Sequence, residues 1–379
     1  MRRAQTAIIT KHRSRQFVAF AILVMLGIGV ILLVASFATQ FPQNSNKLEW
    51  SREESIPKDA IKVTSENDSL PPMLSSSEWE PPTSLGEPVD TRGAEDSPFI
   101  TPDGDILFFF FTPDVRKPAQ EQLSDGVTGI WYSTKTSDGW SEPRRIVLTG
   151  KKELSLDGCP FVQGNVMWFC SARAGSFRGV DMYTAQLTNG AWTNWRNVGE
   201  ILNVEYGVGE LHITSDGKEM YFHSSREGGK GGLDIWVTRM VNGEWQQPEN
   251  IEAVNTSTDE GWPFVTQDAN ELWFTQTYNG SPSIFRSKKV GDEWSTAKLI
   301  VSQFAAEPSL DNYGNLYFVH HFFKDGRMIE ADIYVAYKKQ PLQDLKVPNS
   351  IEAISCASMI SMNAKTESCH RRLKWRLQL

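Results

Sequence analysis

Residues 169–195 read FCSARAGSFRGVDMYTAQLTNGAWTNW, and residues 222–248 read FHSSREGGKGGLDIWVTRMVNGEWQQP. The two stretches begin 53 positions apart and stay in register almost without a gap. In the first stretch the matching residues are Ser171, Arg173, Gly175, Gly179, Asp181, Gly190 and Trp192. In the second they are Ser224, Arg226, Gly228, Gly232, Asp234, Gly243 and Trp245. Self-similarity at a fixed period of this size indicates a repeat architecture.

The repeat extends beyond these two stretches. Five segments share a short apolar run, a polar turn and a second run that ends in aromatics: SPFITPDGDILFFF (97–110), CPFVQGNVMWFC (159–170), ELHITSDGKEMYFH (210–223), WPFVTQDANELWFT (262–275) and EPSLDNYGNLYFV (307–319). Two β-runs joined by Asp-Gly or Gly-Asn are typical of a hairpin. A third apolar run follows each hairpin, and a Trp-containing segment follows the first four. Four short strands per unit of about 45–60 residues predict propeller blades.

The Trp segment that the fifth unit lacks is found at the N-terminal end of the repeats. SEWEPPTSLGEPVDT (77–91) resembles GEWQQPENIEAVNT (243–256), and each leads into the next hairpin. A ring of blades must join its ends, because an open ring leaves unpaired strand edges. We therefore expect an all-β fold over residues 77–338, a five-bladed β-propeller of four-stranded blades. Residues 77–91 are expected to complete the last blade by pairing near 331–338.

The pattern of residues that recurs in the units also resembles the repeat of a known family. P-x-x-[ST]-x-D-G-x-x-[LM]-[YFW]-F followed by S-x-R-x-G-x-x-x-G-x-D-[IM]-[WY] is similar to the WD40-like (PD40) repeat of TolB-type β-propellers. The likeness covers about residues 77–338 and is sharpest in ITSDGKEMYFHSSREGGKGGLDIW (213–236). It weakens in the fourth and fifth units, and TolB has six blades where five are counted here. The resemblance implies a propeller in the bacterial cell envelope and does not imply an enzyme.

Residues outside the repeats point to a membrane. Residues 17–38 are uncharged and overwhelmingly apolar, long enough for a transmembrane helix, and residues 1–16 form a basic tail that we expect in the cytoplasm. The alternative is a signal peptide cleaved after Ala38. Residues 39–76 are rich in polar residues and Pro, which predicts a flexible acidic linker, and residues 339–379 form a tail left unassigned. The basic start leaves a charge of −13 on the rest, which argues against nucleic-acid binding.

An acidic residue precedes the innermost predicted strand of every unit. These residues are Glu95, Asp96, Asp157, Glu210, Asp259, Glu260 and Glu307. In a propeller they would surround one mouth of the central channel. Two carboxyl groups at a suitable distance could hydrolyse a glycosidic bond there. Because the acid recurs in each repeat, we favour a structural role, in which it caps backbone amides or pairs with an Arg. A cation at this mouth is a weaker alternative, since no calcium-loop spacing is present.

Other candidate residues are interpreted structurally. Arg173 and Arg226 are expected to brace loops by pairing with Asp181 and Asp234. His320 and His321 alternate across a strand, which favours packing over metal binding. If the second hairpin turns at 164–165, residues whose numbers sum to 329 face each other, as Cys159 and Cys170 do. A disulfide and two buried free thiols are both open there.

We therefore expect a membrane-anchored, extracytoplasmic propeller that acts as a binding or scaffolding module for a protein or a cell-envelope glycan. No metal or other cofactor is expected. The alternative is a glycoside hydrolase or lyase that uses carboxylates at the propeller mouth. The absence of Gly-x-Ser-x-Gly and His-Glu-x-x-His motifs supports the binding interpretation.

Overall fold

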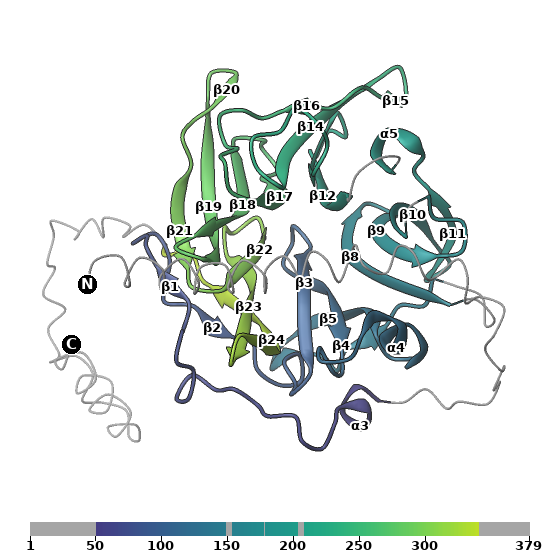
Figure 1. Cartoon of the computed structure of the whole chain (residues 1–379), viewed down its shortest axis with the longest axis vertical. Coiled ribbons are helices and arrows are strands. Elements are labelled where there is room, and N and C mark those ends of the chain that lie inside the picture. Colours follow the sequence, from purple (N-terminus) through teal and green to yellow (C-terminus); the bar gives the residue numbers. More distant parts are fainter. Residues whose placement is uncertain (1–50, 149–153, 178, 204–207, 341–379) are drawn as a thin grey trace, which may run out of the picture. The chain divides into compact units, whose positions relative to one another are not determined.

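Antiparallel hairpins dominate the computed structural model of the chain, which describes residues 51–148, 154–177, 179–203 and 208–340. The apolar runs of the repeat form the strands, and the Asp-, Asn- and Gly-containing segments form the turns, as the sequence predicts. Within the described residues the strands form four hydrogen-bonded sheets, and in the largest of them one parallel bridge, between Ala331 and Ala94, joins two antiparallel groups. The antiparallel groups are called units here and are described in chain order (Figure 1).

The units follow one another along the chain. The first unit contains β3 (Ala94–Ile100), β4 (Ile106–Thr112), β5 (Gly129–Thr136), β6 (Gly139–Trp140) and β7 (Arg144–Arg145). The second contains β8 (Ser155–Gln163), β9 (Val166–Arg173), β10 (Val180–Thr188) and β11 (Ala191–Asn197). The third contains β12 (Val208–Ile213), β13 (Glu219–Ser224), β14 (Asp234–Val241), β15 (Glu244–Trp245) and β16 (Glu249–Asn250). The fourth contains β17 (Glu260–Val265), β18 (Glu271–Tyr278), β19 (Ser281–Val290), β20 (Glu293–Trp294) and β21 (Lys298–Ser302). The fifth contains β22 (Ala305–Leu310), β23 (Leu316–Lys324) and β24 (Arg327–Ala336).

The first strand of each unit lies at the centre of the assembly. Contacts run from β3 to β8, then to β12, β17 and β22, and β22 contacts β3 again. Figure 1 shows this succession, in which the colours pass around a common centre. Sheets of antiparallel strands arranged in this closed order form a β-propeller.

Each unit contributes the same large side chain to the core. The residues at equivalent positions of the second strands are Phe109, Phe169, Phe222, Phe274 and Phe318. All five have an exposed fraction of 0%. Full burial of one such side chain contributes about 1.5–3 kcal/mol, so this position is a main source of packing between neighbouring sheets.

The N-terminal segment closes the ring as predicted for residues 77–91. In β2 (Thr83–Ser84), Thr83 pairs with Val335 and Ser84 with Tyr334 of β24. A separate bridge joins Trp79 to Lys338. The segment also extends the fourth unit, because β1 (Met73–Leu74) pairs with β21. The fifth unit therefore receives its outer strand from the other end of the repeats.

Residues 51–76 differ from the flexible linker expected over 39–76. The short helix α3 (Arg52–Ser55) buries Arg52, and Lys62 forms ion pairs with Glu330 and Asp332. Composition alone suggested a free segment because few apolar residues are present, but the segment is held by these ion pairs and by Ile56, which is buried in the core. Two further short helices lie in loops. α4 (Ala119–Ser124) lies between β4 and β5, and α5 (Glu200–Asn203) lies between β11 and β12.

Several predicted segments lie outside the described residues: the basic tail 1–16, the anchor 17–38, the first part of the linker up to residue 50, and residues 341–379 of the tail. In the part of the chain that the structure does describe, no helix is long and apolar enough to cross a bilayer.

Candidate functional site

A β-bulge interrupts the innermost strand of every unit at the same place. The registers shift between Asp96 and Phe99 in β3, and at equivalent points in β8, β12, β17 and β22. The side chains that follow the start of the bulge line one small cavity on the propeller axis, here called the axial pocket: Ser97, Cys159, Glu210, Trp262 and Glu307. Four of them, all except Glu210, have φ between 50° and 59°. Such left-handed conformations are costly for residues other than glycine, and they frequently mark sites where a side chain must be aimed.

The floor of the axial pocket is formed by the residues two positions further along the same strands. They are Phe99, Phe161, His212, Phe264 and Ser309. The ring centroids of Phe161 and His212 lie 4.6 Å apart, and those of His212 and Phe264 lie 4.2 Å apart. Burial lowers the pKa of His212 to about 3, so this ring is neutral near pH 7. The aromatic floor confines the pocket to about 30 Å³, enough for water or an ion.

The acids predicted to form one ring fall into two groups. Glu95, Asp157 and Glu260 occupy one repeat position and hydrogen-bond to donors close by in their own units, as the structural interpretation expected. Asp157 accepts hydrogen bonds from Ser171 and Arg173, and Glu260 accepts from Thr256 and Thr258. Glu95 accepts from Thr91 and also from Arg52 of the N-terminal segment. Asp259, one residue before β17, accepts from the Leu233 amide.

The remaining acids do not follow the repeat. Asp96 in the first unit, Glu210 in the third and Glu307 in the fifth converge on the axis, where the equivalents of Glu210 in the other units are Ser97, Cys159 and Trp262. The prediction that one acid recurs at the same place in every unit is therefore wrong. Glu95, Asp157 and Glu260 lie two residues before the pocket position of their units, whereas Glu210 and Glu307 occupy that position, so the two sets lie at different places in space.

His321 of β23 completes this group, which we call the axial cluster: Asp96, Glu210, Glu307 and His321. Its Nε2 lies 3.4 Å from Asp96 Oδ1, and one ligand atom from each of Asp96, Glu307 and His321 lies within 4.8 Å of the others. The packing role expected for His321 is thus incomplete. Its neighbour His320 instead pairs through Nε2 with Asp68, at 3.1 Å.

The protonation states in the axial cluster are strongly perturbed. Burial raises the pKa of Glu307 well above its usual range, and the charges of Asp96 and Glu210 add to the rise. Burial, with a contribution from the charge of Asp96, raises the pKa of Glu210 to about 7. Burial also opposes ionisation of Asp96, but His321 outweighs it and the pKa of Asp96 is lowered. Like charges in one small site cannot all ionise.

Three atoms of the axial cluster are buried without a hydrogen-bond partner: Glu210 Oε1, Glu307 Oε2 and His321 Nε2. Buried polar atoms are nearly always satisfied, so an exception calls for an explanation such as a bound ion or a functional role. The sequence contains one signal of this site. Each unit has a dipeptide directly before Phe99 or its equivalent. This dipeptide is Ser-Pro, Cys-Pro or Trp-Pro in three units, but it is Glu-Leu at 210–211 and Glu-Pro at 307–308.

The predicted loop braces have different partners. Arg173 pairs with Asp157, with Nη2 at 2.7 Å from Oδ1, and not with Asp181. Asp181 accepts from the Phe177 amide and the Asn197 side chain. Asp234 likewise accepts from the amides of Lys230 and Gly231, and Arg226 donates to Ser224. The aspartates hold loop backbone, and the arginines brace the strands.

Cys159 and Cys170 are free thiols. The pairing sum of 329 holds from Phe161 to Gln163, but the bulge changes it, and Cys170 pairs with Gly158. The prediction that Cys159 directly faces Cys170 is therefore wrong. The two thiols remain neighbours, since a hydrogen bond to Cys170, together with burial, raises the pKa of Cys159.

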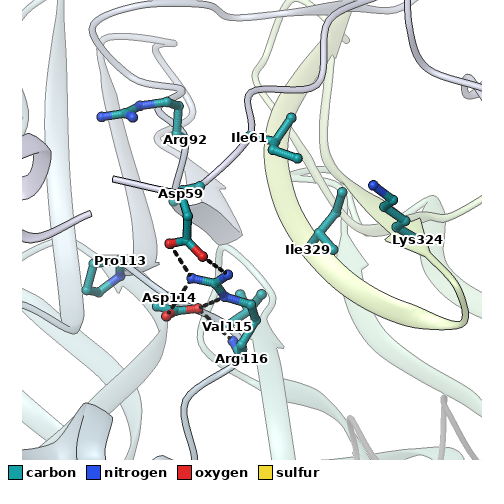
Figure 2. A pocket seen from close by; sticks show the side chains of 11 residues that line it. Asp59, Ile61, Arg92, Pro113, Asp114, Val115, Arg116, Lys324 and Ile329 are labelled. Carbon is teal, nitrogen blue, oxygen red and sulfur yellow. Dashed lines mark hydrogen bonds and ion pairs between the residues drawn. The ribbon is translucent and has the colours of Figure 1, made fainter. Parts of the chain in front are cut away.

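A second cavity, of about 60 Å³, lies where the N-terminal segment meets the first and fifth units. Figure 2 shows its charged side chains: Arg116 lies between Asp59 and Asp114 and pairs with both, at 2.8 Å and 2.7 Å. Because these charges satisfy one another at an exposed surface, this cavity is a weaker candidate than the axial pocket.

Comparisons with known proteins give only distant similarities. No model of a known protein family matches the chain, and no curated protein matches it. Among solved structures, TolB from Acinetobacter baumannii is 14% identical, with a TM-score of 0.38 over 66% of this chain and 56% of that one. The chain thus spans little more than half the length of that protein.

Two carbohydrate-active enzymes are also similar. The endo-arabinase from Bacteroides thetaiotaomicron is 13% identical, with a TM-score of 0.40 over 65% of this chain and 95% of that one. The catalytic domain of the Coprinopsis cinerea GH62 α-L-arabinofuranosidase is 11% identical, with a TM-score of 0.44 over 70% and 98%. These values are too low to support an argument about activity, so the fold assignment rests on the strand pairing described above.

Proposed function

We propose that the chain is a five-bladed β-propeller, anchored in a membrane by residues 17–38, that acts outside the cytoplasm as a binding module. The envelope setting is suggested by the apolar N-terminal segment and by the likeness of the repeats to TolB-type propellers. The binding face is the mouth that holds the axial pocket. The observation that carries this proposal is local: the repeat is broken at the five pocket positions, where Ser, Cys, Glu, Trp and Glu replace one another.

Binding is favoured over hydrolysis by the dimensions of the site. A pocket of about 30 Å³ is far smaller than the roughly 300–1,000 Å³ of sites that enclose a small organic ligand. Oxygens of Asp96 and Glu307 lie within 4.8 Å, whereas glycosidases separate their carboxyl groups by about 5–9.5 Å to admit the scissile bond and water. A protein loop or glycan end resting on the mouth needs neither condition.

A second function, glycoside hydrolase or lyase, is favoured by one observation. The pKa of Glu210, about 7, is the value that a general acid needs near neutral pH. The two functions are separated by assaying a panel of polysaccharides with the wild type and with Glu210→Gln and Glu307→Gln. Activity that both substitutions abolish would establish the enzyme, and Glu260→Gln serves as control because Glu260 pairs with Thr256 and Thr258.

The binding function is tested by probing an array of cell-envelope glycans and a detergent extract of envelope proteins with the purified chain. Trp262→Ala and Glu210→Gln are expected to lose the bound partner, because both side chains line the pocket. The exposed Glu244→Gln, on the outer strand β15, is expected to retain it. Equal retention by all variants would place binding elsewhere. N-terminal sequencing tests the anchor: a mature chain that begins at Thr39 would contradict it.

A further inference from the structure

Among the residues that the structure describes, two groups of acidic and histidine side chains are close enough to share one cation, and their charges are balanced differently. The first consists of Asp90, Glu95 and Asp332, all buried. Two basic side chains of the N-terminal segment reach it. Arg52 Nη1 lies 3.1 Å from Glu95 Oε1, and Lys62 Nζ lies 2.6 Å from Asp332 Oδ2. The protein thus supplies the cations of this group itself.

The second group, Asp96, Glu307 and His321, has a different complement. Its two carboxyl groups lie beside the imidazole of His321, which carries a positive charge only when it is protonated. Glu307 and His321 are 7% and 5% exposed, and Glu307 Oε2 has no hydrogen-bond partner. His321 Nε2 also makes no hydrogen bond, and its polar contact is Asp96 Oδ1 at 3.4 Å. A buried polar atom without a partner destabilises the folded state. The unpaired Glu307 oxygen lies beside a second carboxylate and an imidazole nitrogen, which indicates that another species satisfies it.

We propose that Asp96, Glu307 and His321 bind one divalent transition-metal ion beside the axial pocket, which Glu307 also lines. Two carboxylate oxygens and one imidazole nitrogen form a mixed donor set. Calcium and magnesium prefer oxygen ligands alone, whereas imidazole suits zinc, iron and nickel. The ion neutralises the two carboxylates and accepts the free electron pair of His321 Nε2.

The distances suit such an ion. Ligands 2.0–2.1 Å from a tetrahedral metal lie about 3.4 Å apart. Nε2 of His321 and Oδ1 of Asp96 are already separated by 3.4 Å. The largest separation in the set is below 4.8 Å, so small side-chain rotations suffice. The ligands come from β3, β22 and β23, and β22 and β23 pair directly with each other, so two of the three ligands lie on adjacent strands of one ladder.

The axial pocket leaves room for further ligands. Its volume of about 30 Å³ can hold water next to Glu307, the proposed ligand that lines it. Glu210 lies on the same pocket, with Oε1 unpaired, and is the nearest further carboxylate. A metal with three protein ligands and water is open to an external donor. This inference does not depend on the proposed binding function, since the ion could be structural or could contact a ligand.

The test is a titration of the full chain in detergent, after removal of metals with a chelator. Isothermal titration calorimetry with Zn²⁺, Mn²⁺ and Ca²⁺ is expected to show a site for Zn²⁺ that Ca²⁺ fills at least 100-fold more weakly. His321→Gln and Glu307→Gln are each expected to weaken Zn²⁺ binding at that site by tenfold or more. His320→Gln and Glu260→Gln are matched controls, because both residues are buried but have partners outside the proposed site. His320 pairs with Asp68, and Glu260 accepts a hydrogen bond from Thr256.

Unchanged Zn²⁺ affinity in both site variants, or tighter binding of Ca²⁺ than of Zn²⁺, would overturn the proposal. If a site variant fails to fold, the wild type still decides the question. Co²⁺ added to the metal-free wild type is expected to produce visible absorption bands that one equivalent of Zn²⁺ per site removes. The same bands in His320→Gln support the assignment, and their absence in the wild type contradicts it.

Discussion

Arg52 and Arg173 occupy equivalent places in neighbouring units although they lie in unrelated parts of the sequence. Arg173 Cζ stands 5.1 Å from the ring centre of Phe169 and pairs with Asp157. Arg52 Cζ stands 5.5 Å from the ring centre of the equivalent Phe109 and pairs with Glu95. The first unit has Pro113 where the second has its arginine. The N-terminal segment therefore supplies the residue that this repeat lacks.

Replacing Arg52 by Met is expected to lower the free energy of unfolding by about 2–4 kcal/mol, because it leaves Glu95 buried without its partner. Burial already raises the pKa of Glu95 to about 7 against the effect of Arg52, so protonation limits the loss. Adding Glu95→Gln should recover part of it. Urea denaturation followed by Trp fluorescence measures both steps.

The control for this substitution is Arg92→Met. Arg92 pairs with Glu53 at 3.0 Å, but the side chains are 35% and 62% exposed. Exposed pairs contribute about 0–1 kcal/mol, so a small effect is expected. Equal losses for Arg52 and Arg92 would show that the buried pair has no special role.

The two cysteines provide another test at this scale. Iodoacetamide added to the chain unfolded without reductant is expected to label both Cys159 and Cys170, because the bulge prevents direct pairing and both are free thiols. Mass spectrometry of the tryptic digest reads the result. A peptide pair that separates only after reduction would show that the neighbouring thiols do oxidise.

Among the elements, the hairpins were predictable and the bulges were not. Alternating apolar residues and Asp-Gly turns specify a hairpin locally, and Phe109, Phe169 and Phe222 recur in register along the sequence. The bulge at Ser97 or Cys159 depends on a left-handed backbone conformation that neither residue type indicates. For that reason the pairing of Cys170 could not be derived from spacing. The different repeat position of Glu210 and Glu307 can, by contrast, be read from the aligned repeats.

The segment before β2 connects the fourth and fifth units. Glu78 Oε1 lies 2.6 Å from Arg286 Nη2, and Glu78 Oε2 lies 2.7 Å from Lys338 Nζ. The adjacent Trp79 is 1% exposed and packs edge-on against Trp273, with ring centres 5.4 Å apart. This short element therefore joins two sheets through one carboxylate and one indole.

Glu78→Gln is expected to destabilise the protein in a pH-dependent way. Hydrogen bonds from Arg286, then Lys338, lower the pKa of Glu78 from 4.5 to about 2. A lowered pKa stabilises the folded state fully above about pH 4.5, and this stabilisation is lost as pH falls toward 2. Because the carboxylate is over a third exposed, the effect should be about 0.5–1 kcal/mol at pH 7 and smaller at pH 3.

Thermal unfolding at pH 7 and pH 3 measures the difference. Glu80→Gln, two residues along the same segment and exposed, is the matched control and should change little at either pH. A loss for Glu78→Gln that is as large at pH 3 as at pH 7 would mean that the ion pairs do not contribute.

For the whole molecule, the ring is closed by contacts that are distant in sequence. The repeat count predicted the strand pairing, because a missing strand in the fifth unit matched a surplus one near residue 80. It could not predict the ionic anchoring by Arg52 and Lys62, since a polar segment without periodicity carries no signal of what it binds. Of the axial cluster, the sequence signals only Glu210 and Glu307. The approach of Asp96 and His321 to Glu307 depends on contacts between the first and fifth units, which the spacing does not show.

A chain that begins at residue 95 is expected to lose the cooperative transition of a chain that begins at residue 51. It lacks β1, β2, Arg52, Lys62 and Trp79, so the edge of β24 is exposed, and exposed strand edges promote aggregation. Buried Glu330 and Asp332 would also lose Lys62, whose pKa they raise although burial opposes it. Scanning calorimetry and light scattering measure both effects.

A synthetic peptide of residues 51–94 should restore the transition, whereas the same peptide with Lys62→Ala and Trp79→Ala should restore it less. Identical melting midpoints for the two chains without peptide would show that the ring does not need this closure.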